Sequence, residues 1–151
     1  MLLLGDIGNT ETKICLVSLN KKIIKKITFS SKNITNVKLK KNFKKLKLKN
    51  LSLEKCLFCS VVPKTFKIIK KHITRYYKVK CFELKDLKIN KLIKIKVNKK
   101  QIGSDRLANA IGSMNNKDNF IILDFGTATT FDVLVKNVYH GGLISPGIRL
   151  S

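Results

Sequence analysis

Two short segments of this 151-residue chain combine an aspartate, a glycine, and amide or hydroxyl side chains. Asp6–Thr12 has the sequence DIGNTET, and Asp124–Thr130 has the sequence DFGTATT. Glycine allows the backbone to approach an anion closely, while Asn and Thr side chains donate hydrogen bonds to phosphate oxygens. The aspartate cannot bind phosphate itself, but it can hold a cation that neutralises the phosphate charge. The pattern therefore predicts two phosphate-binding turns.

Both turns stand between apolar segments, so each is expected to join two strands. Residues 2–7 and 12–19 flank the first turn, and residues 120–123 and 130–135 flank the second. A single Asp-x-Gly turn is common in hairpins, and two unrelated structural turns are the alternative interpretation. The recurrence of strand, turn and strand at a long interval favours a duplicated domain whose two turns grip a nucleotide.

A third candidate lies between the turns, at Gly103-Ser104-Asp105-Arg106. The apolar residues within 107–111 predict a helix, and Ser104 or Asp105 is expected to cap it. Helix N-termini favour anions. Asp105 is therefore either an acid–base group or only a favourable charge at the start of the helix, and spacing alone leaves both interpretations open.

The other apolar patterns place these motifs in an α/β framework. Residues 31–50 are rich in lysine, and their pattern fits either a helix or an exposed strand. Pro63 favours the start of a helix, because proline is well accepted in the first helical turn. The further strands are expected at residues 23–29, 57–62 and 79–84.

The formal net charge of +23 is the most unusual bulk property. It suits either a nucleic-acid-binding protein or a solvated lysine-rich surface. The lysines are dispersed between apolar residues, and arginine, the better residue for bidentate contacts, occurs only at Arg75, Arg106 and Arg149. This distribution favours the solvated surface. No apolar run approaches the roughly 20 residues of a membrane span, and the start lacks a signal-peptide pattern, so a cytoplasmic location is expected.

The four cysteines include a C-x-x-C pair, Cys56 and Cys59. A zinc site needs further ligands, and neither a second such pair nor a nearby histidine accompanies this one. The pair lies among apolar residues. Buried cysteines in a reducing compartment are therefore the favoured interpretation.

Taken together, the motifs resemble the N-terminal part of the type III pantothenate kinase (CoaX) family, in the actin/hexokinase/Hsp70-type ATPase superfamily. The resemblance implies an α/β protein with a duplicated ribonuclease-H-like fold. Residues 1–100 would form the first domain, residues 101–117 a bridging helix, and residues 118–151 the start of a truncated second domain. The matching segments are Asp6–Thr12, Cys59–Pro63, Gly103–Arg106, Asp124–Asp132 and a presumed turn at Gly141–Gly147.

The resemblance also implies ATP-dependent phosphorylation of pantothenate to 4'-phosphopantothenate, the first step of coenzyme A biosynthesis, by a cytoplasmic homodimer. Asp105 would be the general base, and Asp124 would bind a monovalent cation, K⁺ or NH₄⁺. Pantothenate would contact Gly103, Ser104, Asp105 and Arg106. ATP and Mg²⁺ would lie against Asp6, Ile7, Gly8, Asn9, Thr10, Glu11, Thr12, Lys13 and Thr127.

Two departures from the family pattern leave other functions open. The aromatic residue and Asn-Pro that usually precede Gly-x-Asp-Arg are reduced to Asn98, and the chain ends at Ser151, where the helices of the second domain are expected. The alternatives are a regulatory relative that binds nucleic acid, an inactive fragment, and another sugar or acid kinase. The Gly-x-Asp-Arg match argues against the last of these.

Overall fold

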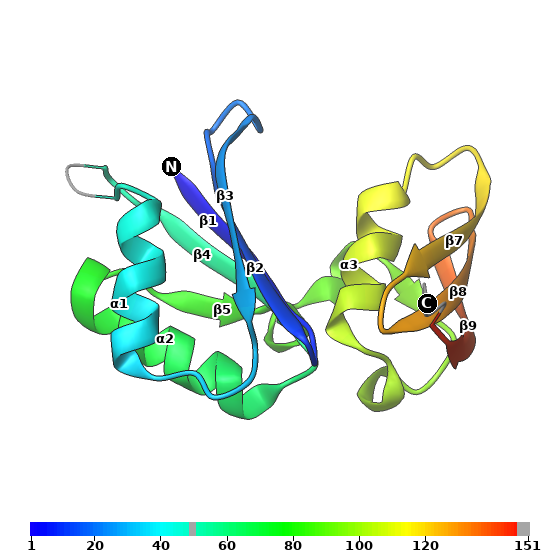
Figure 1. Ribbon diagram of the computed structural model, residues 1–151. Helices are drawn as coiled ribbons and strands as arrows, with labels where there is room; N and C mark the ends of the chain where they lie inside the picture. The colour runs from blue at the N-terminus through cyan, green and yellow to red at the C-terminus, as the bar shows by residue number, and fades with distance from the viewer. Residues whose placement is uncertain (49–50, 148–151) are drawn as a thin grey trace. The chain divides into compact units, whose positions relative to one another are not determined.

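The computed structural model describes residues 1–48 and 51–147. It has the α/β class predicted from the sequence, and it divides into two compact units, Met1–Leu87 and Lys88–Ser151. Each unit has one β-sheet with its own helices (Figure 1). Within the described residues, no helix is both long enough and apolar enough to cross a bilayer.

The first unit is built on a five-stranded sheet with the order β3-β2-β1-β4-β5. β1, β2 and β3 form an antiparallel meander, whereas β4 runs parallel to β1 and β5 parallel to β4. The five strands expected from the apolar runs are confirmed, with ends that differ by a few residues. They are β1 (Leu2–Ile7), β2 (Glu11–Val17), β3 (Ile23–Ser30), β4 (Lys55–Ser60) and β5 (Cys81–Glu83).

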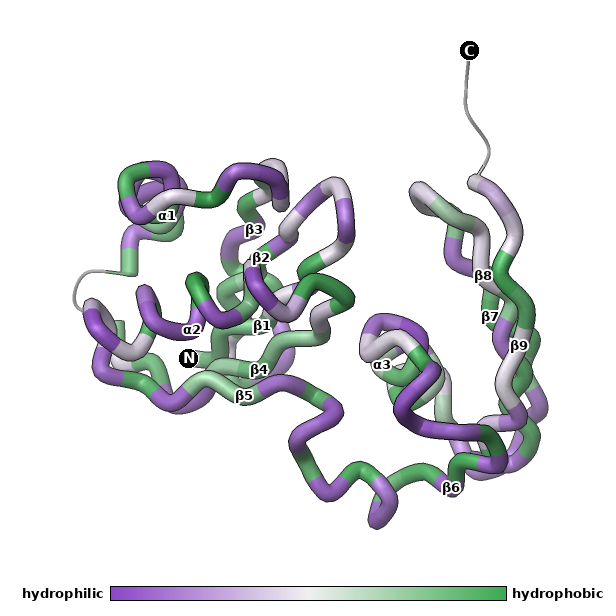
Figure 2. Tube along the Cα trace, turned by 90° about the horizontal axis from the view of Figure 1, so that it is seen from below, coloured by the Kyte–Doolittle hydropathy of each residue, from purple (hydrophilic) through white to green (hydrophobic). Residues whose placement is uncertain are grey.

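Two helices cover one face of this sheet (Figures 1 and 2). α1 (Asn36–Lys45) begins after Thr35, whose Oγ1 accepts the N–H of Lys38 at 3.3 Å. The ambiguous lysine-rich segment therefore contains a helix, and its residues 49 and 50 lie outside the described part. α2 (Pro63–Tyr77) begins at the predicted proline. The unit closes with the short 3-10 helix η1 (Leu84–Asp86).

Alternate residues of the strands face these helices and form the core of the first unit. Leu3 and Ile7 of β1 and Phe58 of β4 are 0% exposed, and burying each such side chain contributes about 1.5–3 kcal/mol. A Cβ on Gly5 would stand 2.0 Å from the Phe58 ring, so the glycine admits that ring. The residues between them, including Asp6, face the other side of the sheet because side chains alternate along a strand.

The second unit is built on a four-stranded sheet with the order β6-β9-β8-β7. Its β7–β8–β9 meander is antiparallel, as predicted for the residues around the second turn, and β6 runs parallel to β9. The unit contains η2 (Ile89–Lys91), β6 (Lys94–Ile95), η3 (Lys99–Gln101), α3 (Ser104–Ser113), β7 (Asn119–Phe125), β8 (Ala128–Val135) and β9 (Val138–Pro146).

The boundary between the units lies before residue 100, the limit expected for the first domain. β6 pairs with β9, so residues 94–95 belong to the second unit. The assignment of residues 1–100, 101–117 and 118–151 as successive parts of a duplicated fold stays a prediction.

The prediction of a turn at Gly141–Gly147 is wrong, because most of this segment lies in strand β9. Its glycines have other roles. Gly141 has φ of +91°, which an L side chain rarely adopts, at a β-bulge opposite Val133 and Leu134. A Cβ on Gly142 would stand 1.7 Å from the carbonyl oxygen of Phe131, so Gly142 permits close strand contact.

The two faces of the β7–β9 sheet are covered differently. α3 lies along one face (Figure 2). On the other face, Ile121, Phe125 and Leu143 are 69%, 65% and 74% exposed. The described part of this unit thus leaves one sheet face apolar and open.

The four cysteines are free thiols, and all of them lie in strands of the first sheet. Burial raises the pKa of Cys56 to about 11 and that of Cys81 to about 12. Of the C-x-x-C pair, Cys56 confirms the expectation of a buried thiol. Cys59 is only half-buried, and its Sγ lies 3.6 Å from Oδ1 of Asp6.

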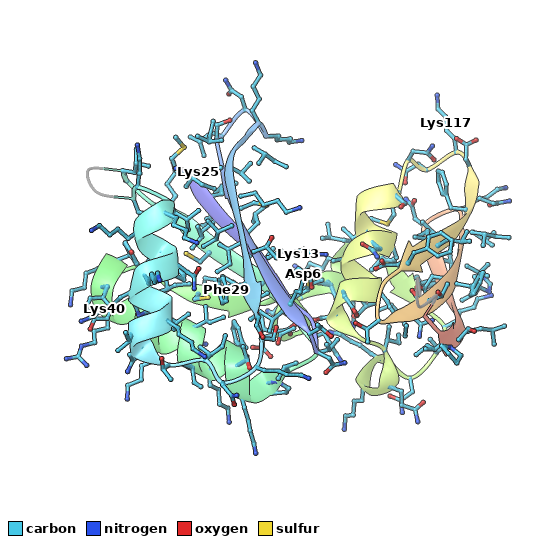
Figure 3. All side chains as sticks on the ribbon, in the orientation of Figure 1. Asp6, Lys13, Lys25, Phe29, Lys40 and Lys117 are labelled. Atoms are coloured by element: carbon cyan, nitrogen blue, oxygen red, sulfur yellow. The ribbon has the colours of Figure 1, made fainter. Side chains whose placement is uncertain are left out.

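Lysine side chains project from several elements of the first unit. Figure 3 labels Lys25 on β3 and Lys40 on α1, whose Nζ also lies 5.2 Å from the centre of the Tyr76 ring. The positive charge is therefore carried by more than one element. The solvated-surface interpretation stays a prediction.

Candidate functional site

The first predicted phosphate turn connects β1 and β2. Asp6 pairs with Lys13 across the ladder (Figure 3), and Ile7 pairs with Thr12. The N–H of Gly8 donates to the carbonyl of Glu11 at 2.9 Å and closes the turn. The exposed residues at its tip are Asn9, Thr10 and Glu11.

Two residues predicted to contact ATP direct their side chains into the core. Ile7 and Thr12 are both 0% exposed, and Thr12 Oγ1 is hydrogen-bonded to Ser31 Oγ at 2.8 Å. Both residues are therefore buried, unlike those at the exposed tip of the turn. Asp6 and Lys13 lie on the opposite face of the sheet, where Lys13 is exposed.

The second predicted phosphate turn connects β7 and β8, and it is tighter than the turn between β1 and β2. Asp124 pairs with Thr130, and the N–H of Gly126 donates to the carbonyl of Ala128 at 3.1 Å. Thr127 stands exposed at the tip. Gly147 packs on this turn, since a Cβ there would stand 2.3 Å from the carbonyl oxygen of Gly126.

Asp124 connects the end of β7 to α3. Its Oδ2 accepts a hydrogen bond from Nδ2 of Asn109 at 3.0 Å. Thr130, directly across the ladder, has a buried Oγ1 with no hydrogen-bond partner within the described residues. An open hollow of about 440 Å³ lies here. Its lining residues are Ala108, Asn109, Gly112, Ser113, Ile122, Leu123 and Asp124.

The Gly-Ser-Asp-Arg motif forms the start of α3, as its position before apolar helical residues predicted. The expected side-chain cap is wrong: Gly103 is the N-cap residue, and no side-chain hydrogen bond caps the helix. The reason is that the helix already begins at Ser104, which is 1% exposed. Asp105 is half-buried in the first turn, and its Oδ1 accepts the N–H of Arg106 at 2.8 Å.

The Arg106 side chain is directed to the sheet. It is 8% exposed, and its Nε donates to Oδ1 and Oδ2 of Asp132 at 3.0 and 3.1 Å. Nη2 also donates to Oδ1, at 2.7 Å, and the hydroxyl of Tyr139 donates to the same oxygen. The hydrogen bond to Asp132 is the main cause that raises the pKa of Arg106. Burial, followed by the bond to Asp132, raises the pKa of Tyr139, which stays protonated.

Sequence reasoning assigned no role to Asp132, Tyr139 or Asn109. Asp132 carried a usable signal, because a carboxylate within the apolar run of β8 requires a partner when buried. The chain has only 3 arginines, so Arg106 was one of few partners able to bind it bidentately. Tyr139 had no such signal.

Comparison with known proteins gives a consistent result. The model of the family described as type III pantothenate kinase matches residues 2–151. The type III pantothenate kinase of Pelagibacter ubique (strain HTCC1062) is 65% identical over 151 residues, which cover 100% of this chain and 61% of that protein. The enzyme of the same description from Desulforapulum autotrophicum is 34% identical over 158 residues, covering 100% of this chain and 60% of that protein. The chain thus spans about three fifths of the length of these curated relatives.

A solved structure with a similar fold is the ethanolamine utilization protein EutJ from Carboxydothermus hydrogenoformans. It has a TM-score of 0.54 and 11% sequence identity, and the match covers 96% of this chain and 51% of that protein. At this identity the likeness shows the fold alone. It agrees with the α/β class that the sequence predicts.

Proposed function

Because the chain belongs to the type III pantothenate kinase family, whose model matches residues 2–151, we propose that the protein phosphorylates pantothenate with ATP. The product would be 4'-phosphopantothenate, formed in the first step of coenzyme A biosynthesis. The observation that carries this proposal is the half-buried Asp105 in the first turn of α3, in a chain with two Asp-x-Gly hairpins. Phosphoryl transfer depends mainly on positioning and on neutralising charge, which such groups supply.

Asp105 acts as the general base on the hydroxyl of pantothenate. One of its oxygens, Oδ1, accepts the N–H of Arg106. This bond fixes the carboxylate and leaves Oδ2 to accept the proton of the attacking hydroxyl. Gly103, Ser104 and Arg106 complete the pantothenate site at the N-terminus of α3, which favours a negatively charged ligand.

The β1–β2 hairpin binds the phosphates of ATP. Gly8 permits a close backbone approach, and Asn9 and Thr10 supply exposed donors at the tip. Lys13 lies beside Asp6 on the same face. The carboxylate of Asp6 suits Mg²⁺, which proteins hold by one or two carboxylates together with substrate phosphates. Bound Mg²⁺ neutralises phosphate charge.

The end of β7 binds the monovalent cation. Asp124 supplies a carboxylate, and the unpartnered Oγ1 of Thr130 stands across the ladder from it. Oxygen donors of this kind fit K⁺, which is coordinated by oxygen atoms. Thr127, at the exposed tip of the same hairpin, contacts ATP.

Replacing Asp105 tests the assignment of the base. In the complete gene product that contains these residues, Asp105→Asn should lower kcat by about 10²–10⁴-fold and leave ATP binding intact. Asp86→Asn, which alters an exposed aspartate of η1, is the control and should keep wild-type turnover. Wild-type rates for Asp105→Asn would remove this residue from the mechanism.

The full-length protein is also proposed to be a cytoplasmic homodimer, as the family resemblance implies. Light scattering coupled to gel filtration measures its mass directly. A monomeric mass for an active enzyme would contradict the dimer.

A further inference from the structure

Arg106 is the cationic residue of the proposed pantothenate site, yet its guanidinium is engaged by the protein. Nε and Nη2 together make three hydrogen bonds to the carboxylate of Asp132. Asp132 is 0% exposed and Arg106 is 8% exposed. Bidentate pairs of this kind fix the orientation of the guanidinium as well as its charge. Arg106 is therefore held in one rotamer before any substrate arrives.

The surroundings are shaped to accept this pair. A Cβ on Gly142 would stand 2.9 Å from Nη2 of Arg106, so glycine leaves room for the guanidinium. Tyr139, also 0% exposed, donates its hydroxyl to Oδ1 of Asp132. Three elements, α3, β8 and β9, thus meet at one carboxylate.

A local irregularity of β9 directs Tyr139 to this carboxylate. The register shift places Tyr139 opposite Leu134, while Gly141 remains opposite Val133. Leu134 and Asp132 are two residues apart on β8 and so share a face. Tyr139 and Gly141 are two residues apart and would share a face in a regular strand, but the bulge puts them opposite neighbouring residues of β8 and so on opposite faces. The positive φ of Gly141 is the backbone feature that makes this arrangement.

The pair is connected to the proposed base through a single residue. The side chain of Arg106 binds Asp132, and its backbone N–H donates to Oδ1 of Asp105 at 2.8 Å. A shift of Arg106 would therefore move the carboxylate that accepts the proton. Stability alone does not explain the buried pair of Arg106 and Asp132, because apolar groups of similar volume often stabilise a fold equally well.

We propose that Asp132 and Tyr139 are positioning residues, which hold Arg106 and thereby orient Asp105 toward the hydroxyl of pantothenate. This inference rests on the proposed kinase function. It assigns Asp132 and Tyr139 to the pantothenate site, so ATP binding is independent of these two residues. Small displacements of reacting groups are costly, since an error of about 1 Å reduces rates about 10²-fold.

The test compares steady-state kinetics of the complete gene product and two variants. Tyr139→Phe removes one hydroxyl and keeps the ring, and it should lower kcat/KM for pantothenate about 10-fold. Asp132→Asn removes the negative charge and should lower it about 100-fold. KM for ATP should stay at the wild-type value in both. Tyr76→Phe, the same change at a side chain that is 45% exposed on α2, is the matched control.

Kinetics per folded molecule distinguish positioning from simple support of the fold. Loss of Asp105 orientation lowers kcat per folded molecule, and loss of Arg106 positioning raises KM for pantothenate. A purely structural role would lower only the fraction of folded protein, and would leave kcat per folded molecule and both KM values unchanged. That pattern in Tyr139→Phe would overturn the inference. If Asp132→Asn does not fold, Tyr139→Phe decides the matter alone. A wild-type protein without pantothenate turnover would remove the proposed function and this inference together, whereas an active wild type with unaffected variants removes only the inference.

Discussion

The two Asp-x-Gly hairpins have similar sequences but pair their strands differently. In the first, the aspartate stands opposite Lys13, the residue after the last threonine of the motif. In the second, Asp124 stands opposite Thr130, which is the last threonine itself. A shift of one residue moves every side chain to the other face of a strand. Equivalent threonines therefore have different surroundings: Thr12 is in the core, while Thr130 shares a face with the aspartate.

In the proposed site, this difference distinguishes the surroundings of the two aspartates. The first turn has a lysine beside its aspartate and suits phosphates. The second has a hydroxyl beside its aspartate, and this set of oxygen atoms suits a cation. Sequence similarity alone assigns both turns the same chemistry. The strand register separates them.

The helices also cover opposite sides of the two hairpins. α1 and α2 pack on the face of Leu3 and Ile7, away from Asp6. α3 packs on the face that carries Asp124, as its Asn109 bond shows. Ile121, which corresponds to Leu3 in the repeat, is consequently 69% exposed in the described residues. A motif and its flanking strands thus do not determine which face becomes the core.

The largest predicted effect concerns this difference in burial. Ile7→Ala should destabilise the first unit by about 2–5 kcal/mol, because it leaves a cavity in a packed core. Ile121→Ala, the same change at an exposed position of β7, should alter stability by less than about 1 kcal/mol in this chain. Urea unfolding followed by circular dichroism measures both. Equal losses would contradict the burial assigned to the two strands.

A smaller effect is expected on the cation requirement. Thr130→Val removes the hydroxyl opposite Asp124 and should raise the K⁺ concentration for half-maximal activity about 10-fold, equivalent to about 1.4 kcal/mol. Thr12→Val, at the same motif position, should leave the K⁺ requirement unchanged and reduce stability by about 1 kcal/mol, since Ser31 loses its partner. If both variants changed the K⁺ requirement alike, the two turns would not be chemically distinct.

The smallest effect is expected on ATP affinity. Lys13→Gln removes the cation beside Asp6 and should raise KM for ATP several-fold, roughly 1 kcal/mol of an exposed charge interaction. Lys25→Gln on β3 controls for the loss of one positive charge from the same sheet. Activity titrations with ATP at fixed pantothenate provide the values. A KM for ATP that responds equally to both changes would indicate only the effect of net charge.

Local patterns were sufficient for much of the fold. The first three strands, α2 and the β7–β8 pair follow from apolar periodicity and from Pro63, because these signals lie within each segment. α1 was ambiguous because its lysines obscure the periodicity, and the Thr35 cap lies outside the apolar pattern. The turn expected at Gly141–Gly147 was wrong because glycine and proline usually mark turns, whereas here glycines serve a bulge and a close strand contact.

The candidate site was predictable only in part. The sequence identified Asp105 and the two hairpins, because those motifs are contiguous. It did not identify the partner of Arg106, since Asp132 and Tyr139 are brought together by a helix, two strands and a bulge. Nor did it give the different registers of the hairpins, which depend on how each turn closes rather than on the shared letters.

The most direct test of the account is the formation of 4'-phosphopantothenate from pantothenate and ATP by the complete gene product. The assay is run with Mg²⁺, with and without K⁺, on protein shown to be folded. We predict product that depends on K⁺ and that falls about 10²–10⁴-fold in Asp105→Asn. A folded wild-type protein that forms no product under these conditions would contradict the proposed kinase function.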